Sequence, residues 1–277
     1  EHFKLTPRQI GFYGGMLRNK YSGDQLRLQQ EFPCTAKESF LATGTPIFPS
    51  QAIEKYKNKR YAGKKYLTDN ANKIENLDQA KQAEHVVPGK TNYFEIWRPP
   101  VAGRKYLISA DPARGVAGGD YSAACIFDIG RVNLVGIVHG RLDLKFFAQI
   151  LKRLGHIYNE ALLMPEVTGL GAGLLANIHD DYFNIYLQRR EDELGVKLTN
   201  KRGWETNNTS RLSMVSAART KFVERAEYKP EEHLPSVVIL NEMATFVQNN
   251  VCKPEADKNC HDDLVMAYCM GVKGCLD

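Results

Sequence analysis

The order of apolar patterns between residues 105 and 187 constrains the fold of this chain more than any other feature of its sequence. Runs of branched apolar residues predict three strands in succession, over 105–110, 121–129 and 132–139. Alternating patterns then predict a helix, a strand, a helix and a strand, over 142–158, 161–164, 171–179 and 185–187. A purely parallel, doubly wound sheet would place a helix directly after the first strand. This order instead predicts an α/β fold with a mixed sheet, in which a three-strand antiparallel meander is followed by parallel strands and helices cover both faces.

The segments on either side of this region carry patterns of their own. Before it, we expect helices over 6–21 and 35–44, the second opened by the capping-box pattern of Thr35 and Glu38, with a further helical stretch to about Phe32 between them. A short strand is expected over 94–97. After residue 187, the patterns predict a hairpin, a long helix, a strand, a short helix and a final helix, over 195–204, 210–226, 237–240, 243–251 and 261–272.

Composition excludes two classes of protein. With 43% apolar and 25% charged residues, the 277-residue chain is too apolar for intrinsic disorder, and no apolar run approaches the roughly 18 residues of a membrane span. The chain opens with Glu1 rather than Met and no signal-like segment follows, which predicts a fragment or processed piece of a soluble intracellular protein. The net charge of +5 permits a polyanionic partner without requiring one. Residues 45–92 are rich in Lys and Asn, and we interpret them as a solvated surface helix and loop.

The cysteines do not form a recognisable metal or disulfide pattern. There are six of them, with no CxxC pair and no secretory signal. Cys252, Cys260 and His261 lie near one another in the sequence and raise the question of zinc. The two cysteines are too widely spaced for a usual zinc half-site, and no second close pair accompanies them, so the pattern disfavours zinc.

Acidic residues stand at the ends of the predicted elements rather than in their solvated middles. Asp111 ends the first core strand, Asp120 follows a glycine-rich turn, Glu166 lies just beyond the fourth strand, and Asp262 and Asp263 open the final helix. Strand ends and loops are where a rigid scaffold presents functional groups. If the first and fourth strands are parallel neighbours, their two acids emerge side by side at one edge of the sheet. The final helix can then bring its carboxylates to the same place.

A cluster of carboxylates predicts a bound cation. Carboxylates repel one another at neutral pH, and hard oxygen ligands favour Mg²⁺ or Mn²⁺. Two such ions about 3.5–4 Å apart can clamp a phosphodiester, so the set predicts two-metal hydrolysis of a phosphodiester. Each acid also has a simpler interpretation. Asp262 or Asp263 is equally consistent with a helix cap, and Asp120 with an ordinary turn residue.

Several segments taken together form a family pattern. They are residues 109–115 (SADPARG), 119–122 (GDYS), Glu166 with Gly169 and Gly171, 203–206 (GWET) with Arg211, 261–267 (HDDLVMA), and 30–33 (QEFP) with 38–40 and Gly44. In this combination the chain resembles the nuclease domain of large terminase subunits from tailed bacteriophages. That domain belongs to the ribonuclease H-like superfamily, close to the RuvC-type Holliday-junction resolvases. One departure is visible, because the family often has an Asn after the second acid, where this chain has Val167-Thr168.

The resemblance implies a fold, a site and an activity. The fold is ribonuclease H-like over residues 45–277, and residues 1–44 are a helical link from the ATPase side of the family's proteins. The metal ligands it implies are Asp111, Glu166 and Asp263 as catalytic residues, with Asp262 and Asp120 supporting or binding through water and His261 in a supporting role.

The same resemblance implies a metal-dependent endonuclease that cuts concatemeric viral DNA during genome packaging, with two Mg²⁺ or Mn²⁺ ions as cofactors. Its partners would be double-stranded DNA, the small terminase subunit and the capsid portal protein, with no membrane. Its location would be the host cytoplasm, transiently at the procapsid portal. No Gly-x-x-x-x-Gly-Lys-Ser/Thr motif occurs, so we expect cleavage without the packaging ATPase.

Basic residues in the predicted hairpin and the helix after it are candidates for DNA contacts. Such contacts to phosphates are independent of base sequence. Solubilising surface charges are an equally open interpretation. The candidates are Lys201, Arg202, Arg211, Arg219 and Lys221.

Two other functions compete with cleavage. A degenerate ribonuclease H-like domain could serve as a non-catalytic docking module for DNA or the capsid portal, and the intact acidic set argues against this. The sugar-kinase and actin branch of the same superfold also begins with an acidic strand end, but it duplicates the domain, and this chain shows one copy. Metal-dependent cleavage without ATP would separate nuclease activity from both.

Overall fold

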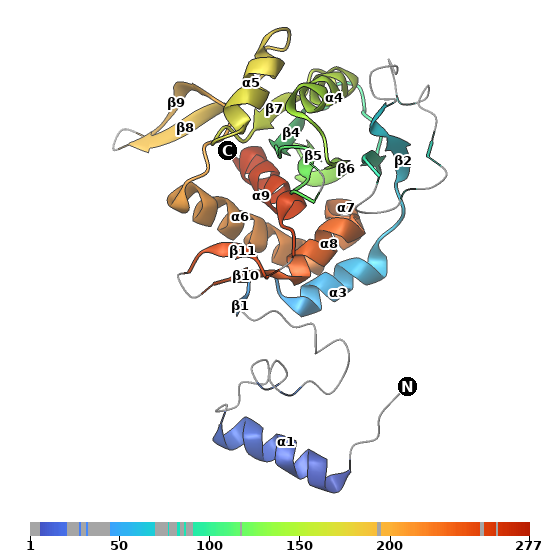
Figure 1. Cartoon of the computed structure of the whole chain (residues 1–277), viewed down its shortest axis with the longest axis vertical. Coiled ribbons are helices and arrows are strands. Elements are labelled where there is room, and N and C mark those ends of the chain that lie inside the picture. The colour runs from blue at the N-terminus through green and yellow to red at the C-terminus, as the bar shows by residue number, and fades with distance from the viewer. Residues whose placement is uncertain are drawn as a thin grey trace.

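The computed structural model describes residues 6–20, 28, 32, 45–69, 77, 82–83, 86, 91–116, 118–192, 195–249, 252–258 and 260–277. Its centre is a six-stranded sheet with the strand order β2-β3-β6-β5-β4-β7 (Figure 1). The strands of this sheet are β2 (Lys64–Leu67), β3 (Tyr93–Ile96), β4 (Tyr106–Asp111), β5 (Ser122–Asp128), β6 (Asn133–Gly140) and β7 (Leu162–Pro165).

The pairing within the sheet confirms the predicted meander and parallel strand. Strands β4, β5 and β6 pair antiparallel in succession, and β7 pairs with β4 in parallel, with Leu107 opposite Leu162 and Ala110 opposite Pro165. The predicted fifth strand over 185–187 is wrong in part. Ile185 makes only a single parallel bridge to Leu163, because the chain turns away from the sheet there and enters a separate hairpin.

Helices cover both faces of the sheet, as the sequence predicts. One face carries α4 (Leu144–Ile157) and α5 (Gly171–His179), which pack on one apolar core. The other face carries a second core and five helices, with α9 running across the sheet (Figure 1). These helices are α3 (Ser50–Lys59), α6 (Asn208–Ala226), α7 (Pro230–His233), α8 (Val237–Ala244) and α9 (Asp263–Leu276). With both faces covered, β5 and β6 are buried along their whole length, which explains their unbroken apolar runs.

Two small sheets lie outside the central one. Strands β8 (Leu187–Asp192) and β9 (Gly195–Arg202) form a hairpin, so the hairpin predicted over 195–204 begins earlier than expected and residues 195–202 are only its second strand. A three-stranded sheet contains β1 (Thr45–Pro46), β10 (Phe246–Gln248) and β11 (Pro254–Ala256). Two sequence predictions are wrong here. The predicted strand over 237–240 is the first part of α8, and the predicted helix over 243–251 is interrupted by β10.

A local capping interaction explains the first of these errors. The Ser236 side chain accepts a hydrogen bond from the Ile239 N–H and so starts a helix. Ile239, Leu240 and Met243 then fall on one buried face, which a strand could not present. A short apolar run does not distinguish these two outcomes by its pattern alone.

The helix over 6–21 is confirmed as α1 (Pro7–Asn19). Thr6 begins it with a capping box to Gln9, and none of its residues is buried. The predicted helix from Thr35 and most of the stretch before Phe32 lie outside the described residues. The boundary at residue 44 therefore stays a prediction.

Helix α3 is not only a solvated surface helix. Its residue Tyr56 is fully buried and stacks on Phe222 of α6, with the ring centroids 4.3 Å apart. Lys55 and Lys57 lie on the outer faces of α3. The basic run therefore contains a buried aromatic residue that packs α3 against α6. None of the helices in the described part of the chain has the length and apolar character needed to cross a membrane.

Candidate metal centre

The parallel pairing of β4 and β7 brings two predicted ligands to the same sheet edge. Asp111 is the last residue of β4, and Glu166 follows β7 directly. The Glu166 N–H donates a hydrogen bond of 2.8 Å to the Ala110 carbonyl oxygen, which extends the ladder past the end of β7. The two carboxylates therefore leave neighbouring backbone positions, as the sequence predicts.

Helix α9 brings the remaining carboxylates to this edge. Its approach to the sheet is fixed by the Ser109 hydroxyl, which donates to the Ala267 carbonyl oxygen at 2.6 Å. At the start of the helix, the Tyr121 N–H donates to Asp263 Oδ2 at 3.1 Å, which ties Asp263 to the beginning of β5. These two hydrogen bonds hold α9 against β4 and its start against the residue before β5.

His261 lies beside two of the predicted acids. Its Nδ1 atom is 3.7 Å from Asp120 Oδ1 and 3.7 Å from Asp263 Oδ2. Each of these three residues offers one ligand atom, and the three atoms lie within 4.8 Å of one another. Asp120 is strongly exposed, whereas Asp263 keeps only 13% of its side-chain surface exposed. The three residues come from the turn before β5 and from the start of α9.

The carboxylates influence one another electrostatically. The pKa of Asp111 is raised well above its usual value, first by burial and then by repulsion from Asp263, Glu166 and Asp262, while Arg211 opposes the shift. The same residue thus interacts with carboxylates from β7 and from α9. Asp111 lies at the electrostatic centre of the group.

The two acids of α9 show the same effect. The pKa of Asp263 is raised to about 7, first by burial and also by repulsion from Asp120 and Asp262, while the hydrogen bond from the Tyr121 N–H opposes the shift. Burial also raises the pKa of Asp262, with Arg211 as the largest opposing influence. Holding these groups ionised at neutral pH therefore costs free energy unless a cation joins them.

The donor set fits a hard divalent cation. Carboxylates from three separate parts of the fold converge, they are desolvated, and they repel one another. Oxygen ligands of this kind suit Mg²⁺ or Mn²⁺ better than zinc or copper. We refer below to Asp111, Glu166, Asp120, Asp262 and Asp263 together with His261 as the metal centre.

Sequence reasoning gave no structural role to two residues next to the metal centre. Glu242 of α8 accepts hydrogen bonds from the first turn of α9, and its segment was predicted as the end of a strand and the start of another helix. Gly171, the first residue of α5, lies so close to Glu166 that a Cβ atom there would be 1.8 Å from the Glu166 carbonyl oxygen. The run of glycines after Glu166 was the only available signal for the second.

The five basic candidates differ in how far they are engaged by partners within the chain. Arg211 donates to the Pro254 carbonyl oxygen at 2.8 Å and Arg219 to that of Ile47 at 2.9 Å. Lys221 pairs with Glu224 and is only 17% exposed. Lys201 and Arg202 are exposed at the end of β9, although Lys201 also pairs with Glu205.

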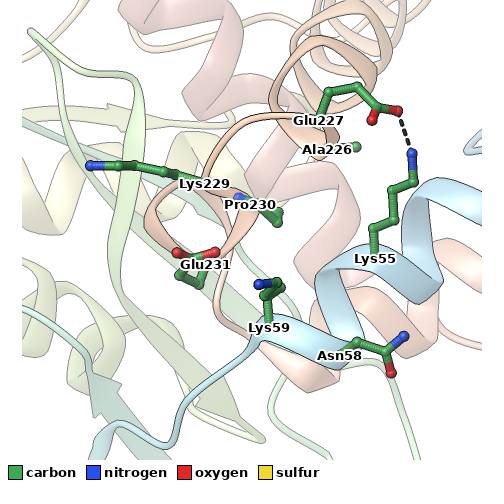
Figure 2. Close-up of a pocket in the computed structure, with 8 residues that line it drawn as sticks. All are labelled: Lys55, Asn58, Lys59, Ala226, Glu227, Lys229, Pro230 and Glu231. Carbon is green, nitrogen blue, oxygen red and sulfur yellow. Dashed lines mark hydrogen bonds and ion pairs between the residues drawn. The ribbon is translucent and has the colours of Figure 1, made fainter.

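Two surface cavities differ in their relation to the metal centre. Lys201 and Arg202 line a cavity of about 690 Å³ between α5 and the β8–β9 hairpin, together with Val167, the neighbour of Glu166. A second cavity of about 470 Å³ lies between α3 and the α6–α7 connection, where the charges of Lys55 and Glu227 pair (Figure 2). This second cavity adjoins the C-terminal end of α6, whereas Arg211 lies near the N-terminal end. The two ends of this 19-residue helix are about 28 Å apart.

Without metal, we expect the Asp263→Asn variant to be more stable than the parent, by a margin that grows as the pH rises. The folded pKa of Asp263, about 7, lies above the unfolded value of about 3.9, so the folded state binds more protons between them. The contribution of Asp263 to the free energy of unfolding therefore falls as the pH rises through this window. Melting temperatures of both proteins in EDTA from pH 5 to pH 8 measure the difference.

The comparison with a variant is needed because two histidines act in the opposite direction. Burial lowers the pKa of His139 to about 4 and that of His233 to about 3, so their contribution to stability rises with pH. The parent and Asp263→Asn share both residues, which cancels their effect. A difference in melting temperature that stays constant from pH 5 to pH 8 would contradict the raised pKa.

Comparison with solved structures gives a consistent result. The large terminase nuclease from thermophilic phage G20c with bound magnesium aligns with a TM-score of 0.55 at 12% sequence identity, over 84% of this chain and 98% of that chain. The same nuclease with bound cobalt aligns at 0.49 and 14% identity, over 65% and 86% of the two chains. The nuclease domain of the Thermus phage P74-26 large terminase aligns at 0.46 and 15% identity, over 64% and 83%.

The first of these alignments establishes the fold. The chain has the fold of a large terminase nuclease domain, and the predicted ribonuclease H-like architecture is confirmed. No protein-family model and no curated protein sequence matches the chain. The roles of individual residues therefore depend on the geometry of the metal centre.

Proposed function

We propose that this chain is a metal-dependent DNA endonuclease that cuts concatemeric viral DNA during genome packaging. The observation that carries the proposal is the electrostatic interaction of Asp111 at the end of β4 with Glu166 after β7 and Asp263 of α9, which together with burial raises the pKa of Asp111 well above its usual value. The fold shared with a terminase nuclease that binds magnesium supports it. The intact carboxylate set disfavours a purely non-catalytic docking module.

In this proposal, Asp111, Glu166 and Asp263 would hold two divalent cations, Mg²⁺ or Mn²⁺. Bound cations would polarise the phosphodiester and favour ionisation of the attacking water. Asp262 and Asp120 support the ligand set from its edge. His261, which lies between Asp120 and Asp263, holds these two carboxylates in place through its ring nitrogen. The sheet edge keeps the ligands preorganised, because β4 and β7 are hydrogen-bonded neighbours.

We also propose that double-stranded DNA runs over the metal centre toward the β8–β9 hairpin. Lys201 and Arg202 are the exposed cations on this path, and they share a cavity with Val167, the residue after Glu166. Contacts from them to phosphates would position the backbone without reading the bases. Arg211 is turned toward Pro254 and the carboxylates, so its first role is to balance their charge. Arg219 and Lys221 would reach DNA only by giving up their present partners.

The packaging role extends the proposal to other proteins. Cutting a concatemer at the procapsid requires a link to the capsid portal and to the small terminase subunit. The site of action would then be the cytoplasm of the host cell. The proposed metal ligands all belong to this chain, so we expect cleavage without these partners.

We expect the chain to nick and linearise supercoiled plasmid with Mg²⁺ or Mn²⁺ and without ATP. The carboxylates need a cation to act, so EDTA should abolish the reaction. Because the DNA contacts proposed here are made to phosphates, plasmids of unrelated sequence should be cut at similar rates. Gel electrophoresis with each metal, with EDTA and with ATP measures the result. Cleavage that persists in EDTA would refute the metal-dependent mechanism.

A further inference from the structure

The start of α9 has backbone N–H groups that are not capped by the side chain of the residue before the helix. The first N–H groups of a helix have no partner within the helix, and the side chain of the residue before the helix commonly accepts one of them. Asp262 occupies this position in α9 but makes no capping hydrogen bond from its side chain. Other groups must accept hydrogen bonds from the free N–H groups of the first turn.

The acids of α9 are engaged elsewhere. Asp262 Oδ2 accepts a hydrogen bond of 3.2 Å from the Ala256 N–H of β11, and Asp263 Oδ2 accepts one of 3.1 Å from the Tyr121 N–H. Both carboxylates are thus turned away from the helix axis, toward the sheet edge and β11. This arrangement frees them for the metal centre and leaves the helix start uncapped.

Glu242 supplies the missing acceptor from another helix. Its Oε2 atom accepts hydrogen bonds from the N–H groups of Leu264 at 3.0 Å and Val265 at 3.1 Å. Burial raises the pKa of Glu242 well above its usual value, with repulsion from Asp263 and Asp262 adding to the shift, while the two hydrogen bonds from the α9 backbone oppose it. The backbone of Glu242 is held in turn, because the N–H and the hydroxyl of Thr245 both donate to its carbonyl oxygen.

We propose that Glu242 is a positioning residue of the metal centre, which caps α9 in place of Asp262 so that Asp262 and Asp263 can face the cation. The inference rests on the proposed function, since it assumes that the centre binds a divalent ion. Glu242 acts through the first turn of α9 and contacts its backbone rather than the carboxylates of Asp262 and Asp263. Its loss lets that turn shift or lets Asp262 rotate back to cap the helix, and either change removes a ligand from the cation.

Three substitutions in the full 277-residue chain test this role. Glu242→Gln keeps an oxygen acceptor in the same place, and Glu242→Ala removes the acceptor. Glu242→Met removes it while keeping much of the side-chain volume, so it serves if the Ala variant does not fold. Met243→Ala is the matched control, because Met243 is fully buried on the same helix and its truncation lowers stability without removing the Glu242 acceptor from the α9 backbone.

The measurement is Mn²⁺ affinity by calorimetry on the folded chain without DNA, followed by plasmid cleavage as a function of Mn²⁺ concentration. Residues that orient metal ligands typically contribute about 10–100-fold to metal affinity, and we expect a loss of this size for Glu242→Ala and Glu242→Met. Cleavage by these variants should recover at high Mn²⁺. Glu242→Gln should bind Mn²⁺ nearly as the parent does, and Met243→Ala should melt earlier with unchanged affinity.

Each outcome has a definite meaning. Parental affinity in Glu242→Ala or Glu242→Met would overturn the inference and leave the proposed function standing. An equal loss in Met243→Ala would overturn it too, since the effect would then follow from stability alone. An equal loss in Glu242→Gln would show that the charge, rather than the acceptor, matters, which also contradicts capping. A parent chain that binds no Mn²⁺ would instead refute the proposed function, and with it the inference.

Discussion

Asp111→Asn is expected to abolish DNA cleavage while leaving the fold intact. Asp111 interacts electrostatically with Asp263, Glu166 and Asp262, that is, with proposed ligands that follow β7 and that begin α9. Metal assistance contributes several kcal/mol to such reactions. Since about 1.4 kcal/mol corresponds to a tenfold change in rate, we expect the rate to fall by at least about a thousandfold. Initial rates of plasmid nicking at saturating Mn²⁺ measure the loss.

Two other acids provide graded controls for this experiment. Asp120 is strongly exposed and lies at the edge of the metal centre, so Asp120→Asn should be milder than Asp111→Asn. Asp263→Asn should be intermediate to severe. The Asn variants at 111 and 263 should melt no earlier than the parent in EDTA, because each removes a repelling charge. An Asp111→Asn protein that folds and cuts at nearly the parental rate would refute the assignment.

Gly171→Ala is expected to impair cleavage through the backbone rather than through a ligand. A Cβ atom at residue 171 would lie 1.8 Å from the Glu166 carbonyl oxygen and 3.2 Å from Glu166 Oε2. The first contact is impossible, so either α5 or Glu166 must move. Overpacking of this kind costs about 1–3 kcal/mol of stability, and a shift of about 1 Å at a reacting group can cost about a hundredfold in rate. Nicking rates and melting temperatures together measure both effects.

The matched control lies two residues further along the same helix. At Gly173 the nearest atom to an added Cβ is Leu144 Cδ1 at 3.3 Å, the end of a flexible side chain. Gly173→Ala should therefore keep the parental nicking rate, and replacing a helical Gly by Ala favours the helix by up to about 1 kcal/mol. If both variants lost activity equally, the cause would be the glycine content of α5 rather than the contact with Glu166.

The sequence by itself determined strands β3 to β7 of the central sheet and the positions of Asp111 and Glu166, whereas the edge strand β2 lies in a segment interpreted as helix and loop. Strands β4 to β7 carry strong local patterns, because helices bury both faces of the sheet and make each strand apolar along its length. A meander followed by a helix and a strand then restricts the topology, and β7 beside β4 was one arrangement that this order allowed. The proximity of Asp111 and Glu166, which stand at the ends of these two strands, follows from that adjacency alone.

The tertiary structure alone decided which residues support the metal centre. The apolar run at 237–240 suits a strand or a helix, and the Ser236 cap with the buried face of α8 selected the helix. Only the helix places Glu242 against the start of α9. There it accepts hydrogen bonds from Leu264 and Val265, which lie 22 and 23 positions further along the chain. Arg211 likewise turns to Pro254, 43 positions away, rather than to solvent. Local patterns report the burial of single elements, whereas these contacts depend on how separate elements pack, and no short stretch of sequence carries that information.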